Sequence, residues 1–103
     1  MATKTLSGIT VEVTEEGYFT DATKWIPEMA NEMAKEVGLI LTPKHMDVIN
    51  FIREKQQKGE GLTIRAIGKS GFTDIKGFYE LFPGAPLKLA SKISGIPKPA
   101  SCV

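Results

Sequence analysis

Apolar and polar side chains alternate near the start of the chain, in residues 9–14. A period of two residues is typical of a strand that buries one face. Residues 7–8 are Ser-Gly, a pair suited to a tight turn, so residues 5–6 are expected to form the first strand of a hairpin. After a further turn, residues 18–19 are expected to return as a third short strand. The apolar members of the alternation are Ile9, Val11 and Val13.

Beyond residue 20 the apolar side chains recur every three or four residues, which is the spacing of one face of an α-helix. Thr42 followed by Pro43 is a typical helix start, with an N-cap and then a proline in the first turn. Residues 39–41, Leu-Ile-Leu, are expected to form a buried connection, and the charged run 54–58 is expected to be solvated. The predicted helices are residues 21–37, 43–53, 64–70, 74–81 and 86–94.

The apolar faces of these helices predict the core of the protein. His45 lies in the first turn of the second predicted helix, without metal-ligating residues at a suitable spacing nearby. It is therefore interpreted as a capping or packing histidine. The predicted core residues are Trp25, Met29, Met33, Ile49, Ile52, Ile67, Phe78, Leu81 and Ile93.

Together these elements predict a mainly α (α+β) fold, a small orthogonal helical bundle with an N-terminal β-hairpin. The helices at residues 64–70 and 74–81, joined by a turn at Gly71, have the outline of a helix-turn-helix. A length of 103 residues suits a single domain, which is expected to occupy residues 1–94.

The last nine residues, 95–103, read as an extended C-terminal arm. Pro97 and Pro99 lack backbone donors and favour extended conformations before them, so this segment is not helical. The arm carries the only cysteine, Cys102. At roughly 3.3 Å per residue, an extended chain from Gly95 carries that thiol about 23 Å. The alternative is an idle cysteine on a frayed chain end.

Composition excludes several function classes. A formal net charge of +1 argues against nucleic acid as the main ligand, and no run approaches the roughly 20 apolar residues needed for membrane insertion. A lone cysteine suits a reducing compartment, so a cytoplasmic protein is expected. With one histidine, no phosphate-binding loop and no ligand cluster, neither a cofactor nor a metal is expected.

The C-terminal third resembles a known family. Residues 79–84 read Tyr-Glu-Leu-Phe-Pro-Gly, and Ile-Pro-Lys-Pro at 96–99 is followed by the penultimate Cys102. This pattern closely resembles the DsrC/TusE family of sulfur-carrier proteins, and the similarity extends to Trp25 and His45. The resemblance implies a small helical protein whose penultimate cysteine accepts sulfur as a persulfide and passes it on.

One position departs from the two-cysteine members of that family. They carry a second cysteine eleven positions before the penultimate one, where this chain has Ser91. Serine forms no disulfide, so the chain resembles the one-cysteine branch, which includes the relay for tRNA thiolation. An engineered Cys-to-Ser change would give the same sequence.

The resemblance also implies partners and helper residues. A carrier of this kind is a co-substrate, not a stand-alone enzyme, and its partners are sulfur-donor and sulfur-acceptor proteins, including dissimilatory sulfite reductase subunits. Because a thiolate beside the terminal carboxylate is disfavoured, a nearby cation is expected to activate or dock it. The candidates are Lys98, Arg65 and Lys88.

Two other functions stay open at this point. The helix-turn-helix outline allows a DNA-binding regulator in which Lys69, Thr73 and Lys76 face a groove and the cysteine senses redox state. A non-catalytic subunit of dissimilatory sulfite reductase is the other alternative.

Overall fold

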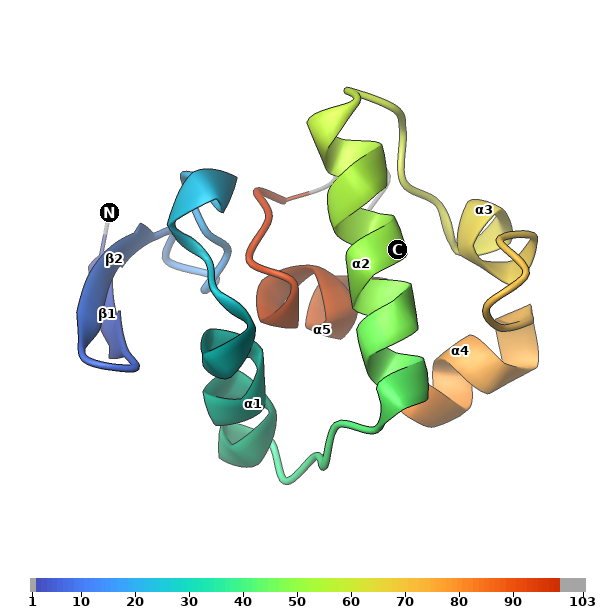
Figure 1. The fold of residues 1–103 in the computed structure, drawn as a ribbon, viewed down its shortest axis with the longest axis horizontal. Helices are drawn as coiled ribbons and strands as arrows, with labels where there is room; N and C mark the ends of the chain where they lie inside the picture. Colours follow the sequence, from blue (N-terminus) through green and yellow to red (C-terminus); the bar gives the residue numbers. More distant parts are fainter. Residues whose placement is uncertain (1, 99–103) are drawn as a thin grey trace.

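A computed structural model describes residues 2–98, and the chain begins in a two-stranded antiparallel hairpin (Figure 1). Strand β1 (Ala2–Leu6) pairs with β2 (Ile9–Val13) so that Leu6 lies opposite Ile9. The predicted hairpin is confirmed, although Ile9 beside the turn is 43% exposed. Phe19 makes one isolated bridge to Val13 instead of a third strand.

The first predicted helix is split in two. A short 3-10 helix, η1 (Ala22–Lys24), is capped by Asp21, and two residues separate it from α1 (Pro27–Glu36). Pro27 lies at the first position of α1 and disfavours helical backbone in the residue before it, Ile26, which is extended. Because α1 ends at Glu36, Val37 falls outside the buried stripe and is 56% exposed.

Helix α2 (Pro43–Gln57) begins as predicted, with the Thr42 side chain accepting the backbone N–H of His45. It continues one turn beyond the predicted end at residue 53, because the polar run still has good helix formers. The connection before it is not buried throughout, since Ile40 is 84% exposed.

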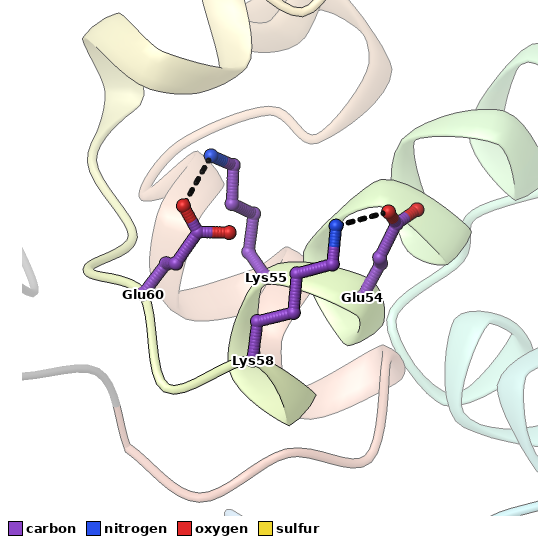
Figure 2. Close-up of polar contacts among 4 residues, drawn as sticks. All are labelled: Glu54, Lys55, Lys58 and Glu60. Atoms are coloured by element: carbon purple, nitrogen blue, oxygen red, sulfur yellow. Dashed lines mark hydrogen bonds and ion pairs between the residues drawn. The ribbon is translucent and has the colours of Figure 1, made fainter.

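The polar end of α2 is the solvated face that the charged run predicted. Lys58 Nζ lies 2.9 Å from Glu54 Oε1 across one helical turn, and Lys55 Nζ lies 3.4 Å from Glu60 Oε2. Figure 2 shows both pairs. The hydrogen bond from Lys58 lowers the pKa of the Glu54 carboxyl and raises the pKa of the Lys58 ammonium.

Two short helices, α3 (Ile64–Gly68) and α4 (Ile75–Leu81), follow and pack on each other. Thr63 and Asp74 cap them through their side chains. Between them the chain turns through Gly71, whose φ of 90° is a left-handed conformation that favours glycine. The helix-turn-helix outline is therefore present, with Ile75 exposed at the start of α4.

The last helix, α5 (Pro86–Ile93), occupies the centre of the bundle. It contacts α1, α2 and α4, and in Figure 1 it lies between α1 and α2. The helical bundle and its N-terminal hairpin match the fold class that the sequence predicted. Within residues 2–98, none of the helices has both the length and the apolar content that a bilayer crossing requires.

The predicted core is found almost as expected. Eight of its nine members are buried, and only Leu81 is partly buried. Phe82, the next residue, is fully buried instead. Helix α4 ends at Leu81, and the extended backbone of Phe82 turns its ring into the core, against Phe78 and His45.

Candidate functional site

Cys102 lies outside the described residues, so the structure describes the start of the predicted arm and not its thiol. The start is well packed. Gly95 donates its backbone N–H to Lys92 O at 3.1 Å, and Ile96 donates to Ser91 O at 3.3 Å. Ile96 is 1% exposed and belongs to the core. The first two residues of the predicted arm are therefore held against the bundle, in what we call the arm root, residues 93–96.

Two side chains from distant parts of the sequence bind the main chain of the arm root. Trp25 Nε1 donates to Ile93 O at 2.9 Å, and Arg53 Nη1 donates to Ser94 O at 2.8 Å. Arg53 Nη2 also donates to Ala22 O at 3.0 Å, and its Cζ lies 4.2 Å from the Trp25 ring centroid. The carbonyls of the arm root are thus held by a stacked Arg–Trp pair.

Arg53 is half-buried in this arrangement and has no carboxylate partner among residues 2–98. Burial lowers the pKa of the guanidinium, which nevertheless stays charged in proteins. Its charge is instead compensated by two carbonyl oxygens and the face of an indole ring, both of which favour a cation.

Gly95 lets the arm root approach Trp25 closely. Its φ is 66°, and an added Cβ would lie 2.1 Å from Trp25 Cδ1. A side chain at this position would therefore clash with the indole and strain the backbone. The sequence indicated that Gly95 ends a helix, and the structure adds the contact with the tryptophan.

Lys98, the last described residue, forms an ion pair with a loop that follows the hairpin. Its Nζ lies 3.0 and 3.1 Å from the two carboxylate oxygens of Glu16. Both side chains are about half exposed, so the pair is a weak and exchangeable one. Lys98, the candidate cation on the arm itself, is thus engaged with an acid.

The other two candidate cations lie on different elements. Arg65 is exposed on α3, which packs on α2 and α4, and Figure 1 shows α3 on the opposite side of α2 from the segment that follows α5. Lys88 is exposed on α5 and lines a surface hollow. The structure does not bring Arg65, Lys88 and Lys98 together into one basic site.

Ser91, the position of the second cysteine in the two-cysteine relatives, is completely buried on the inner face of α5. Its hydroxyl and that of Ser94 are buried without a hydrogen-bond partner among the described residues. An unpaired hydroxyl in a dry interior is unfavourable, whereas a thiol behaves there as a small apolar group. The surroundings of position 91 would thus suit a cysteine at least as well as a serine.

His45 has the capping and packing role that the sequence predicted. Its Nδ1 accepts the Thr42 N–H at 3.0 Å, while its Nε2 lies 2.8 Å from Leu81 O, which only accepts hydrogen bonds. These partners assign the proton to Nε2. Its ring contacts Phe82 edge-on at 5.2 Å, so α2 is fastened to the end of α4.

The local sequence pattern did not indicate Arg53 as an anchor of the arm root, and it predicted Trp25 only as a core residue. Their carbonyl partners lie 31, 41 and 68 residues away, so no local pattern reveals them. The one feature of the sequence that could have indicated Arg53 is its position in α2, where the apolar part of the helix meets the charged part.

Comparison with known proteins gives a consistent result. A family model described as DsrC like protein matches residues 5–103. The gamma subunit of dissimilatory-type sulfite reductase from Nitratidesulfovibrio vulgaris is 34% identical over 105 residues, with 100% of both chains covered. Sulfurtransferase TusE from Buchnera aphidicola subsp. Schizaphis graminum is 41% identical over 101 residues, covering 90% of this chain and 89% of the relative.

Solved structures show the same fold. DsrC from Allochromatium vinosum superposes with a TM-score of 0.81 at 37% identity, covering 98% of this chain and 97% of that one. The oxidized gamma subunit of dissimilatory sulfite reductase from Archaeoglobus fulgidus gives 0.83 at 28% identity, covering 99% and 100%. The resemblance noted in the sequence is confirmed, and the chain belongs to the DsrC family.

Proposed function

We propose that this protein is a sulfur carrier in which Cys102 accepts a sulfane sulfur and presents it to a partner enzyme. Sulfur relay is the function class that the TusE and DsrC relatives support. The observation that carries the proposal is that the family match runs through residue 103, the end that holds the only cysteine of the chain. The packed arm root gives that end a fixed origin.

The transfer needs no external oxidant or reductant. The Cys102 thiolate attacks the terminal sulfur of a donor persulfide, a new S–S bond forms, and the donor leaves as a thiolate. In the second half, an acceptor thiolate attacks the terminal sulfur now on Cys102, which is released as a thiolate. Each step exchanges one S–S bond for another.

Lys98 is the cation that we assign to thiolate activation. It lies four residues before Cys102 and is held by Glu16 in an exposed pair, which exchanges readily. Release from Glu16 would leave a positive charge on the same arm as the thiol, where it favours the thiolate. Arg65 and Lys88 are exposed on other elements and are assigned to partner contacts instead.

Donor and acceptor proteins follow from the named relatives. One relative is a dissimilatory-type sulfite reductase subunit, and others are TusE sulfurtransferases. We infer that the partners belong to sulfite reduction or to tRNA thiolation, in the cytoplasm, where a lone thiol stays reduced. DNA binding has no support among these relatives, and Thr73, one of its three candidate contacts, is buried.

Intact-mass analysis tests the loading step. The full chain is incubated with a cysteine desulfurase and cysteine, and a gain of one sulfur atom is expected, reversed by a thiol reductant. Cys102→Ser should gain none and should keep its melting temperature, since the core described within residues 2–98 is formed by other side chains. A wild-type chain that gains no sulfur from any persulfide donor would contradict the proposal.

Deletion of Pro97 and Lys98 tests the arm as a tether. It draws the thiol inward by roughly 7 Å, which an extended arm has no slack to recover. Because the deletion also removes the activating cation, alkylation of Cys102 by a small reagent should persist at the reduced rate of the Lys98→Gln chain, while transfer to an acceptor protein is lost. Lys98→Gln in the full-length chain is the control for charge: it should slow both reactions without changing reach.

A further inference from the structure

The surface between α1 and α5 carries two neighbouring hollows. One of about 420 Å³ is lined by the end of α1, the loop before α5, and α5 itself. The other, of about 240 Å³, lies between the hairpin, α1 and α5. Both are lined by Val37, Leu89 and Lys92, so they lie side by side, and we call the two together the α1–α5 groove.

The floor of the groove is apolar and open. Val37 is 56% exposed and Leu89 is partly buried, and the neighbouring walls are formed by Leu39, Pro83 and Ala85. Val37 lies one residue beyond the end of α1, outside its buried stripe, and so adds exposed apolar surface to the groove.

Charge in the groove is uneven. Its two carboxylates each pair with a lysine, Glu16 with Lys98 and Glu36 with Lys4. Release of Lys98 would free Glu16, but the three lysines that line the groove, Lys4, Lys88 and Lys92, would still outnumber its two carboxylates. Lys88 and Lys92 form no ion pair within residues 2–98. The Lys92 ammonium lies 5.4 Å from the centroid of the Tyr18 ring. As far as residues 2–98 show, the groove therefore offers apolar side chains together with two lysines that have no carboxylate partner.

The groove also lies beside the start of the arm. Glu16, which lines it, pairs with Lys98, and Ile93 at its edge belongs to the arm root. In Figure 1 the segment that follows α5 runs toward the Gln57 end of α2, whereas the connection between α1 and α2, which forms one wall, lies at the opposite end of the molecule. The described part of the arm thus leads away from that wall.

From this geometry we propose that the α1–α5 groove docks an acidic, amphipathic segment of the protein that exchanges sulfur with Cys102. Apolar side chains of the segment fill the floor, and its carboxylates pair with Lys88 and Lys92. Docking there places the partner next to the arm root, so that the arm reaches the partner from a short distance. The inference deepens the proposed function by naming the recognised chemistry of the partner.

Three synthetic helical peptides of the same length test the groove without sulfur chemistry. One pairs Leu with Glu, one Leu with Lys and one Leu with Gln, and amide chemical shifts of the full-length chain are followed. The Glu peptide should change the amide chemical shifts of Val37, Leu89 and Lys92, and a higher salt concentration should weaken its binding. Equal shifts with the Lys peptide, shifts elsewhere, or none would overturn the proposal.

Charge reversal supplies the matched variant. The double variant Lys88→Glu, Lys92→Glu should have a roughly tenfold lower affinity for the Glu peptide and should bind the Lys peptide. Lys44→Glu, an exposed lysine on α2 outside the groove, should change neither. Loss of Glu-peptide binding in both variants would indicate attraction by net charge alone and would also overturn the proposal.

The single cysteine allows the remaining occupant, the arm itself, to be tested. A nitroxide attached to Cys102 should leave the amides of Val37 and Leu39 sharp if the groove is free, and their broadening would overturn the proposal. Sulfur loading is measured separately. If the chain binds the Glu peptide but never gains sulfur, the docking proposal stands and the proposed carrier function is wrong. If it gains sulfur but does not bind the Glu peptide, the carrier function stands and the docking proposal is wrong.

Discussion

The guanidinium of Arg53 lies 4.2 Å from the ring centroid of Trp25, and both side chains donate hydrogen bonds to the main chain where the arm begins. Arg53 reaches two carbonyls at once, Ser94 O and Ala22 O. A planar, forked donor suits this bridging, and a single ammonium does not. The pair therefore couples the 3-10 helix η1, α2 and the arm root.

Arg53→Gln should lower the free energy of unfolding by about 1.5–3 kcal/mol, because hydrogen bonds from a charged donor are lost and two carbonyls lose their partner. Arg53→Lys should recover less than half of that loss. Chemical denaturation measures both, and hydrogen exchange of the Ile96 amide should accelerate in parallel. Arg65→Gln, an exposed arginine on α3, is the control and should be near neutral. Equal effects at 53 and 65 would contradict the role of the pair.

Gly95→Ala should be among the most damaging single changes in the chain. The new Cβ would lie 2.1 Å from Trp25 Cδ1, on a backbone with φ of 66°. Left-handed strain and overpacking together should cost about 2–5 kcal/mol. Gly59→Ala separates the two causes, since Gly59 has a similar φ of 73° with no heavy atom within 4 Å of the added Cβ.

The measurement is thermal unfolding of both variants under the same conditions. Gly59→Ala should lose only the backbone part, about 1–2 kcal/mol. If the two variants unfold alike, the Gly95–Trp25 contact has enough slack to accept a methyl group, and the packing of the arm root is looser than the structure indicates.

Phe82→Ala should destabilise more than Leu81→Ala. Phe82 is fully buried against Phe78 and His45, so its loss should cost about 3–5 kcal/mol. Leu81 is only partly buried, and its truncation should cost about 1–2 kcal/mol. Urea unfolding of both variants checks the order. The reverse order would mean that helix α4 continues past Leu81 in solution.

The pair at 81 and 82 illustrates what the sequence could predict. Both residues fit the apolar face of the same helix, and the choice depends on where the helix ends. Helix ends are set by tertiary contacts as much as by local sequence. The sequence therefore predicts least well which residue faces the core at the end of a helix. The helix starts were easier, because Thr42, Thr63 and Asp74 cap their own helices within three residues.

The arm root shows where local reasoning stops. Gly95 and the prolines after it predicted the end of the last helix, and that end is found after Ile93. Nothing in the local sequence indicated that Ile96 is buried or that Arg53 binds Ser94 O, because these contacts join residues far apart in the chain. The exposed Val37 and Ile40 were missed for a related reason: hydrophobicity alone does not reveal which side faces the core.

Ser91→Ala should raise the free energy of unfolding by up to about 1 kcal/mol. Its hydroxyl is buried and lacks a partner among the described residues, so its removal relieves a desolvation cost. Ser70→Ala is the matched control, because the Ser70 hydroxyl donates to Ile67 O at 2.6 Å and accepts from the Phe72 N–H at 3.2 Å. That variant should be destabilised. Destabilisation of both would show that the Ser91 hydroxyl has a partner in solution.

The Glu54–Lys58 pair should give a small, two-sided pH dependence of stability. The pKa of Glu54 is lowered in the fold, so its contribution is present above the unfolded carboxyl pKa of about 4.3 and is lost as pH falls through the lower folded value. The pKa of Lys58 is raised, so its contribution is present below the unfolded value and is lost as pH rises through the higher folded one.

Carboxyl-carbon NMR titration measures this directly. Lys58→Gln should return the pKa of Glu54 toward its ordinary value, because it removes the hydrogen bond from Lys58, which is the larger cause of the shift, and the positive charge of Lys58, which is the smaller one. Lys44→Gln, elsewhere on α2, should leave it unchanged. An unaltered Glu54 titration in Lys58→Gln would show that the exposed pair in Figure 2 is not populated in solution.

Both anchors of the arm root bind main-chain carbonyl oxygens. The position at which the arm starts therefore does not depend on the side chains that α5 carries. Trp25 and Arg53 would hold Ile93 O and Ser94 O equally well with other side chains at those positions. A change at position 91, including serine for cysteine, leaves the same carbonyls in place. Substitutions on this helix can therefore change its side chains while the start of the arm keeps the same main-chain anchors.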